Sequence, residues 1–139
     1  MAEEPVEVAR NPWGVILDHE RWRTLELSWL ASTIEMSDGG FKETLELFAA
    51  EGERARPAYM VIDATEFHHE LGDGALEWRD QVIIPRYNAA GVKKFAFLWP
   101  EGTSGTVESG GTPTPEGPAS FPTGWFTGRE RAYKWLMED

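Results

Sequence analysis

Alternating apolar and polar positions near the start of the chain predict a β-hairpin. Residues 23–30 alternate three apolar side chains with three polar ones: Leu25, Leu27 and Trp29 with Thr24, Glu26 and Ser28. A period of two is typical of a strand that buries one face and exposes the other to solvent. A second strand-like run, residues 15–18, is separated from the first by polar residues 19–21, so the simplest interpretation is an antiparallel pair.

A helix and a buried strand are predicted next. After the break at residues 37–40, apolar side chains recur at three- and four-residue spacing, at Phe41, Leu45, Phe48 and Ala49. This spacing indicates an amphipathic helix, which Pro57 closes. The following run, residues 58–62, is continuously apolar and ends at Asp63, as expected of a strand in the middle of a sheet.

The second half of the chain repeats the alternation of helix and strand. Helical spacing begins at Gly74, and Pro85 is expected to end or kink that helix because its ring removes a hydrogen-bond donor. Residues 94–99 predict another strand, and residues 121–126 predict a short edge strand. Thr127-Gly128-Arg129-Glu130 matches a capping box at the start of a last helix, which would bury Ala132, Trp135 and Leu136.

This order of elements predicts one α/β domain. We expect a single-domain sandwich with a mixed, mostly parallel sheet that is opened by an antiparallel hairpin and covered by helices. The domain is expected to span residues 13–139, after a flexible N-terminal arm at residues 1–12. Residues 101–120 are rich in glycine and proline and are expected to form a loop insertion, either mobile or acting as a lid or partner-binding loop.

Composition narrows the classes of function. The chain has 139 residues, of which 41% are hydrophobic, and a formal net charge of −11, which disfavours nucleic acid and anionic lipid as partners. It contains no cysteine, which removes disulfides, thiolate nucleophiles and sulfur-ligated metals. The first residues lack an apolar signal segment and no stretch is apolar enough for membrane insertion, so a cytoplasmic protein is expected.

Two segments resemble those of a known superfamily. Val61-Ile62-Asp63 is followed eleven residues later by Gly74-Ala75-Leu76, and the chain ends with Phe126-Thr127 and then Arg129-Glu130-Arg131-Ala132-Tyr133-Lys134-Trp135-Leu136. Over residues 13–136 this order resembles the sulfate-transporter and anti-sigma-factor-antagonist (STAS) superfamily, and more closely its SpoIIAA-like branch of small stand-alone bacterial domains. The resemblance implies an α/β fold and a binding or regulatory role.

The resemblance also draws attention to Asp73. In regulatory STAS proteins a serine just before the helix-opening glycine is phosphorylated, and the phosphate breaks partner binding. Asp73 takes this position here, and an aspartate offers no hydroxyl to a kinase. The phosphorylation switch is therefore not carried over, and Asp73 is interpreted as a helix cap or as a charge mimic.

The polar loop after the central strand is the main candidate for a site. It contains five side chains able to bind a ligand or partner: Asp63, Thr65, Glu66, His68 and His69. In open α/β sheets ligands bind at the carboxyl ends of the strands, where loops diverge. A metal site is not predicted, because adjacent histidines in an extended segment point to opposite sides and no His-Glu-x-x-His spacing occurs. Acid–base chemistry by these groups stays open as an alternative.

The chain contains seven tryptophans, some of which could mark a binding surface. Four of them fall on strand or helix faces expected inside, namely Trp29, Trp78, Trp99 and Trp135. Trp13, Trp22 and Trp125 are harder to bury, and if they were exposed together they would mark a dimer interface or a ligand groove.

These observations favour a non-enzymatic, STAS-like binding or regulatory domain. It would act through protein contacts or an apolar small ligand, as a homodimer, without cofactor, metal or catalytic residues. The binding candidates are Asp63, Thr65, Glu66, His68, His69, Asp73 and Trp125. The alternative is an enzyme or metal-dependent protein that uses the loop from Asp63 to His69.

Overall fold

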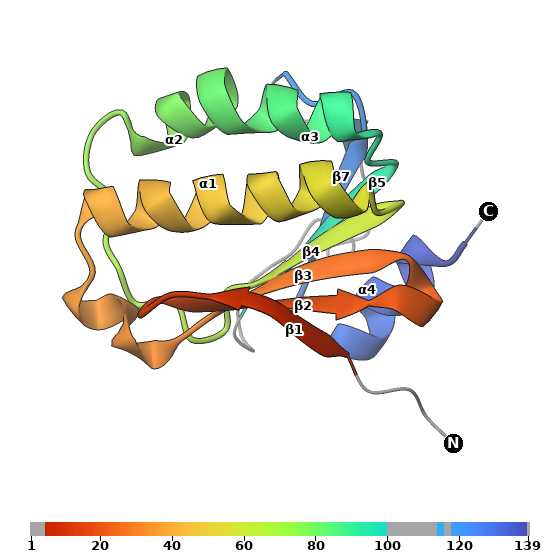
Figure 1. Ribbon diagram of the computed structural model, residues 1–139, viewed down its shortest axis with the longest axis horizontal. Coiled ribbons are helices and arrows are strands. Elements are labelled where there is room, and N and C mark those ends of the chain that lie inside the picture. The colour runs from red at the N-terminus through yellow and green to blue at the C-terminus, as the bar shows by residue number, and fades with distance from the viewer. Residues whose placement is uncertain (1–4, 100–113, 116–117, 139) are drawn as a thin grey trace.

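The computed structural model describes residues 5–99, 114–115 and 118–138, and within these residues seven strands form one sheet with helices on both faces (Figure 1). The strands are β1 (Val6–Arg10), β2 (Gly14–His19), β3 (Thr24–Trp29), β4 (Tyr59–Asp63), β5 (Lys94–Leu98), β6 (Thr114–Pro115) and β7 (Pro122–Phe126). Their order across the sheet is β1-β2-β3-β4-β5-β7-β6.

The sheet is mixed, as predicted. β1, β2 and β3 pair antiparallel, whereas β3, β4, β5 and β7 pair parallel in that order. β4 lies between two parallel neighbours, which confirms the central position expected from its apolar run. The α/β class and the opening hairpin are therefore confirmed.

Residues 6–10 belong to this sheet rather than to the flexible arm predicted for residues 1–12. Asn11 Oδ1 accepts hydrogen bonds from the backbone N–H groups of Trp13, at 2.9 Å, and Gly14, at 3.0 Å. This side-chain turn reverses the chain and lays β1 antiparallel along β2, with a shift of register between Glu7 and Ala9. Asn11, which falls within the arm predicted for residues 1–12, thus closes a second hairpin.

The other end of the sheet also differs from expectation. β7 was predicted to be an edge strand, but it lies between β5 and the two-residue strand β6. The remainder of the predicted loop insertion at 101–120 lies outside the described residues, apart from residues 118–120.

Helices cover both faces of the sheet. α1 (Asp38–Ala55), α2 (Ala75–Trp78), the π-helical segment η3 (Arg79–Ile83) and α3 (Ile84–Ala90) lie on one face, and α4 (Arg129–Leu136) lies on the other (Figure 1). Two short 3-10 turns, η1 (Glu20–Trp22) and η2 (Ala31–Glu35), flank β3. None of the helices in the described part of the chain is long and apolar enough to cross a membrane.

Pro85 does not end its helix, because η3 precedes it. A proline in a helix clashes with the carbonyl four residues earlier and removes one hydrogen bond. Here the wider π turn of residues 79–83 is followed by Ile84 and then by Pro85, which lies in the first turn of α3, where its missing N–H costs little. The helical path consequently continues from residue 75 to residue 90.

The predicted capping box of the last helix is wrong. The N-cap residue of α4 is Gly128 rather than Thr127. Gly128 has an extended backbone, and no side chain at this position caps the first turn. Arg129 and Tyr133 instead face the sheet, where they donate hydrogen bonds to the buried carboxylate of Glu26 in β3. The first turn of α4 is therefore held by contacts to β3 rather than by a local cap.

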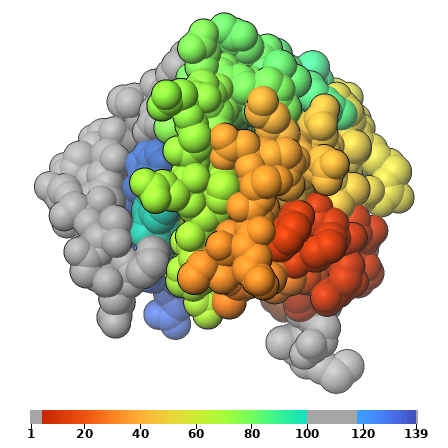
Figure 2. Space-filling view, turned by 90° about the vertical axis from the view of Figure 1, so that its left-hand side faces the viewer, coloured from red at the N-terminus to blue at the C-terminus, as the bar shows by residue number. Residues whose placement is uncertain are grey.

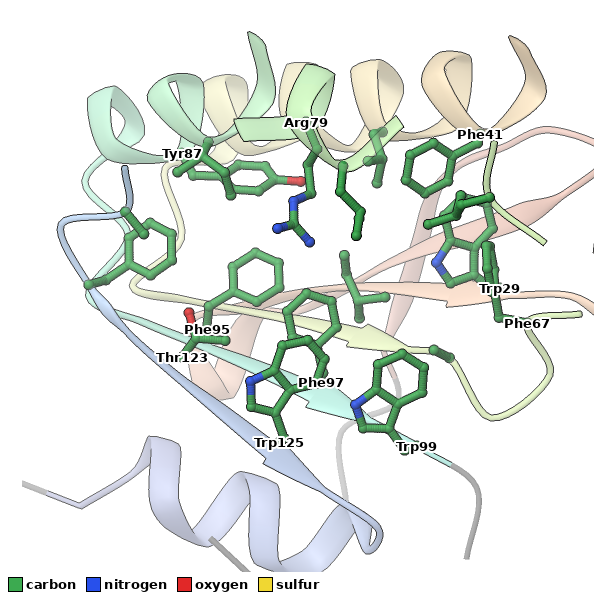
Figure 3. Close-up of a pocket in the computed structure, with 18 residues that line it drawn as sticks. Trp29, Phe41, Phe67, Arg79, Tyr87, Phe95, Phe97, Trp99, Thr123 and Trp125 are labelled. Carbon is green, nitrogen blue, oxygen red and sulfur yellow. The ribbon is translucent and has the colours of Figure 1, made fainter. Parts of the chain in front are cut away.

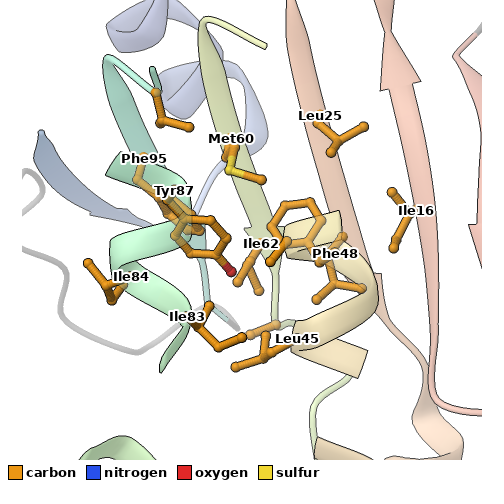
Figure 4. Packing of buried hydrophobic residues seen from close by; sticks show 14 of the residues in the cluster. Ile16, Leu25, Leu45, Phe48, Met60, Ile62, Ile83, Ile84, Tyr87 and Phe95 are labelled. Carbon is orange, nitrogen blue, oxygen red and sulfur yellow. The ribbon is translucent and has the colours of Figure 1, made fainter. Parts of the chain in front are cut away.

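The larger core lies between the sheet and helices α1 and α3 (Figure 4). Leu45 and Phe48 of α1 meet Met60 and Ile62 of β4 there, which confirms the predicted helix face. Phe48 packs edge-on against Tyr87, with ring centroids 6.0 Å apart. A smaller core on the opposite face joins Val61 and Phe126 to α4.

Phe48 provides a test of this packing, because its side chain is fully buried. Phe48→Ala is expected to lower the free energy of unfolding by about 4 kcal/mol, through lost transfer energy and the cavity left behind. Urea denaturation measures this change. Ile34→Ala is the control, since Ile34 is 72% exposed and its truncation should change stability by less than about 0.5 kcal/mol. Equal effects of the two substitutions would contradict the described core.

Candidate functional site

A cavity of about 380 Å³ lies between the sheet and the helices α1, α2 and α3 (Figure 3). Its floor is made by side chains of β5 and β7, and its roof by α1 and the helical path of residues 75–90. Ala64 and Phe67, which follow β4, and Trp99, which follows β5, close one end. The cavity thus lies toward the carboxyl ends of the parallel strands, where ligand sites of α/β sheets usually form.

Three stacked aromatic rings form one wall of this cavity. The rings of Phe97 and Trp125 stack with centroids 4.2 Å apart and an interplanar angle of 9°. Trp99 continues the stack at 5.4 Å from Trp125, with an angle of 11°. Phe97 and Trp125 are partners in the parallel register of β5 and β7, which aligns their rings, and Trp99 follows directly after β5.

A second aromatic group closes the cavity near α1. Trp29 and Phe41 stack with centroids 5.9 Å apart, and Phe67 meets the Trp29 ring edge-on at 4.9 Å. Phe67 reaches this position because the loop after β4 is tied to the segment before α1. Thr33 makes two of the hydrogen bonds that hold this loop: its hydroxyl donates to the Glu66 carbonyl and accepts from the His68 backbone N–H.

Asp38 also holds the loop after β4 in place. One of its carboxylate oxygens lies 2.7 Å from His69 Nε2 and accepts a hydrogen bond from the Gly72 backbone at 3.2 Å. The hydrogen bond from His69 is the main reason that the pKa of Asp38 lies below its usual value. Figure 2 shows the loop after β4, in green, lying against the segment that leads into α1, in orange. This loop is therefore a wall of the cavity, held from outside by polar contacts.

Polar groups in the cavity wall are few. Arg79 extends from the start of η3 into the cavity, and Tyr87 of α3 points its hydroxyl toward it (Figure 3). The Tyr87 hydroxyl is buried and has no hydrogen-bond partner among the described residues. Burial raises the pKa of Tyr87 well above its ordinary value, so the hydroxyl stays protonated at neutral pH.

The predicted binding residues do not converge in this cavity, with one exception. Trp125 lines it. Asp63 accepts hydrogen bonds from the backbone and hydroxyl of Thr65, at 3.0 and 2.6 Å, and pairs with Arg129 on the other face of the sheet. Glu66 lies 3.7 Å from the His68 ring, at the surface.

Asp73 lies in the exposed turn before α2, and its interpretation as a helix cap is wrong. The residue at the helix start is Gly74, with a left-handed backbone (φ 81°), and no side-chain hydrogen bond caps α2. A positive φ strains residues with a Cβ atom, so glycine suits this turn. The charge-mimic role stays a prediction.

Metal ligands are not gathered at the loop. Among residues 5–99, 114–115 and 118–138, the structure contains no group of three or more histidine, aspartate or glutamate side chains that could hold a metal ion. His68 and His69 take separate partners, Glu66 and Asp38. The loop residues Ala64, Phe67 and Leu71 contribute to the cavity instead, and all three are apolar.

The three tryptophans that would mark an interface or a ligand groove if they were exposed together occupy different surroundings. Trp22 is 42% exposed in η1 and Trp125 lines the cavity. Trp13 packs partly buried against the larger core, beside Gly40 at the start of α1. The tryptophan that matters for a ligand groove is therefore Trp125, joined by Trp29 and Trp99, which had been assigned to the core.

A second polar site lies on the opposite face of the sheet, under α4. Glu26 of β3, predicted to face solvent, is only 1% exposed. Its two oxygens receive paired hydrogen bonds from the Arg129 guanidinium, at 2.8 and 2.7 Å. Tyr133 donates to the same carboxylate at 2.8 Å, Ser28 donates at 3.0 Å, and His19 Nε2 lies 3.0 Å from it.

The partners of Glu26 decide its charge. Burial by itself raises the pKa of the Glu26 carboxyl. The hydrogen bonds from Arg129, His19 and Tyr133, with the positive charge of Arg129, more than reverse this, and the pKa lies far below its usual value. The hydrogen bond to Glu26 likewise raises the pKa of Arg129. Glu26 is therefore an ionised, fully bonded anchor for α4, with its oxygens already occupied by protein donors.

One sequence signal could have revealed this anchor. Arg129 and Tyr133 are four residues apart, and side chains at this spacing share one face of a helix. Together with a glutamate in an otherwise strand-like segment, they could have indicated a buried pair. The pattern of β3 alone could not, because alternation does not show which element covers the polar face.

Glu26 predicts a specific dependence of stability on pH. Its folded pKa is depressed, so its contribution is present above the unfolded pKa of about 4.3 and is lost as pH falls below that value. At pH 7, Glu26→Gln should lower the free energy of unfolding by about 3 kcal/mol, since it leaves Arg129 without its carboxylate. Urea denaturation between pH 7 and pH 3 should show the gap between wild type and variant closing in acid.

Glu7→Gln is the matched control, because Glu7 pairs with Arg10 at the exposed surface. An exposed pair contributes less than about 1 kcal/mol, so this variant should follow the wild-type profile. Parallel pH profiles of wild type and Glu26→Gln would contradict the anchoring role of the carboxylate.

Comparison with known proteins finds no relative that could identify this one. No family model, curated protein or solved structure matches the chain. The resemblance to STAS domains therefore stays a prediction from short motifs, and function has to be inferred from the aromatic cavity and the surfaces around it.

Proposed function

We propose that this protein is a non-enzymatic, STAS-like binding domain that holds an apolar, ring-containing small molecule in the aromatic cavity. The observation that carries the proposal is the cavity itself, whose volume of about 380 Å³ is within the range of small-molecule sites. Its lining is dominated by apolar and aromatic side chains, with Arg79, Tyr87 and Thr123 as polar members. This combination is typical of sites that bury a hydrophobic ligand and orient it by a few polar contacts.

The energetics favour a ligand with rings. Burying about 200 Å² of apolar ligand surface would contribute roughly 5 kcal/mol. Stacking against the wall formed by Phe97, Trp99 and Trp125 adds about 1 kcal/mol for each ring contact. After partial loss to ordering, such a ligand is expected to bind with a dissociation constant of about 10–100 μM.

The rival hypothesis, an enzyme or metal-dependent protein acting through the loop from Asp63 to His69, has less support. It requires the polar side chains of that loop to share one pocket. Asp63 bonds to Arg129 and His69 to Asp38, and neither of these loop residues lines the cavity. Self-association is a separate part of the proposal, which light scattering tests directly.

Binding of a neutral aromatic probe tests the proposed function. N-phenyl-1-naphthylamine should increase its fluorescence on titration with the wild-type protein. Trp125→Ala removes one ring of the stacked wall and is expected to weaken binding about tenfold, corresponding to about 1.4 kcal/mol. Trp22→Ala removes an exposed tryptophan outside the cavity and should leave binding unchanged.

Chemical shift mapping locates the probe independently of any variant. Amide shifts should change at the cavity residues, for example Ala64 and Thr123, and not around Glu26 under α4. Absence of binding to the wild type, or shift changes confined to the α4 face, would overturn the proposal.

A further inference from the structure

Arg79 places a positive charge inside a mostly apolar cavity. It is the first residue of the π-helical segment η3, and its side chain is 25% exposed. Figure 3 shows the guanidinium extending from the helical roof toward the aromatic floor. Single π turns in helices occur frequently at functional sites, because they redirect side chains.

Contacts to the described residues hold the guanidinium of Arg79 along one edge only. Its Nε and Nη2 donate to the same oxygen of Asp80, at 3.3 and 3.0 Å. A guanidinium has five N–H donors in a planar fork, and Nη1 donates to none of the described residues. The Asp80 side chain is 39% exposed, so water screens its charge. The outer edge of the fork can therefore bind a second anion.

The Tyr87 hydroxyl supplies another donor at the same place. It is buried, lacks a hydrogen-bond partner among the described residues, and points toward Arg79 (Figure 3). A buried hydroxyl without a partner is destabilising, and a ligand oxygen would relieve this cost. Two kinds of donor thus approach one region of the cavity from α3 and η3.

The aromatic stack restricts the rest of the ligand. Phe97 and Trp125 already stack face to face, with centroids 4.2 Å apart and an interplanar angle of 9°, so a planar ligand ring can add to an outer face of this stack. A phosphate group would bring more charge and more oxygens than these donors can satisfy, whereas a carboxylate has two oxygens and one charge.

We propose that the cavity selects aromatic carboxylates, with the ring on the wall of Phe97 and Trp125 and the carboxylate bound by Arg79 and Tyr87. This inference rests on the proposed function, because it requires the cavity to be the binding site. It adds the chemical class of the ligand and two specificity-determining residues.

A matched pair of ligands tests the inference. 2-Naphthoate and 2-naphthamide have the same ring system and similar size, but only the first is charged at pH 7.5. Isothermal titration calorimetry should show the wild-type protein binding 2-naphthoate at least tenfold more tightly. Arg79→Gln should reduce this preference to less than threefold, mainly by weakening the binding of 2-naphthoate.

Two further variants complete the test. Arg86→Gln is the control, since Arg86 pairs with Glu53 and does not line the cavity, so the preference should be retained. Tyr87→Phe removes only the hydroxyl and should lower the preference several-fold in a protein that stays folded. It decides the outcome if Arg79→Gln fails to fold.

The possible results separate the two proposals. If the wild type binds neither ligand, the proposed binding function fails. If it binds both equally, or if Arg79→Gln and Tyr87→Phe keep the full preference for 2-naphthoate, the carboxylate inference fails while the binding function stands.

Discussion

Burial of the central strand on both faces is the constraint from which the rest of this structure follows. β4 lies between two parallel strands, and Met60 and Val61 are both fully buried although they point to opposite faces. Each face must therefore be covered by helices, because neither can be left to water. α1 and α3 cover one face and α4 covers the other, and each side solves a different packing problem.

On the α4 side, the problem is a charge. Glu26 of β3 points to this face and is covered by the helix, so its carboxylate needs partners in place of water. Arg129 supplies paired hydrogen bonds and most of the compensating charge, and Tyr133 adds a donor one helical turn later. A buried ion pair is not a strong source of stability by itself, but loss of one partner is costly. The pair therefore specifies how α4 sits on the sheet.

On the face covered by α1 and α3, side chains do not fill all the space between the helices and the sheet. α1 packs closely on β4 through Phe48, but the helical path of residues 75–90, which contains η3, leaves an opening above β5 and β7. Large aromatic side chains line this opening without filling it. Hydrogen bonds of Thr33 and Asp38 with the loop at residues 66–72 hold that loop in place, and Phe67 of the loop forms part of the cavity wall. Packing on this face thus creates the cavity and positions the polar groups in it.

The sequence by itself determined the secondary structure of most elements and the fold class, because periodicity of apolar residues is a local property. The hairpin of β2 and β3, the helix α1 and the central strand β4 all follow from spacing alone. The errors arose where a local signal had two meanings. The polar, proline-containing residues 1–12 indicate a flexible arm, but the side chain of Asn11 closes a turn between two strands.

Only the tertiary structure decided the site. Asp63, His68 and His69 lie within seven residues of one another in the sequence, but their side chains diverge, because successive side chains of an extended loop point in different directions. Arg79, Tyr87 and Trp125 come from separate elements and meet in one cavity, as Glu26 and Arg129 meet on the opposite face. Contacts between residues far apart in the chain depend on which faces pack together, and no local pattern contains that information.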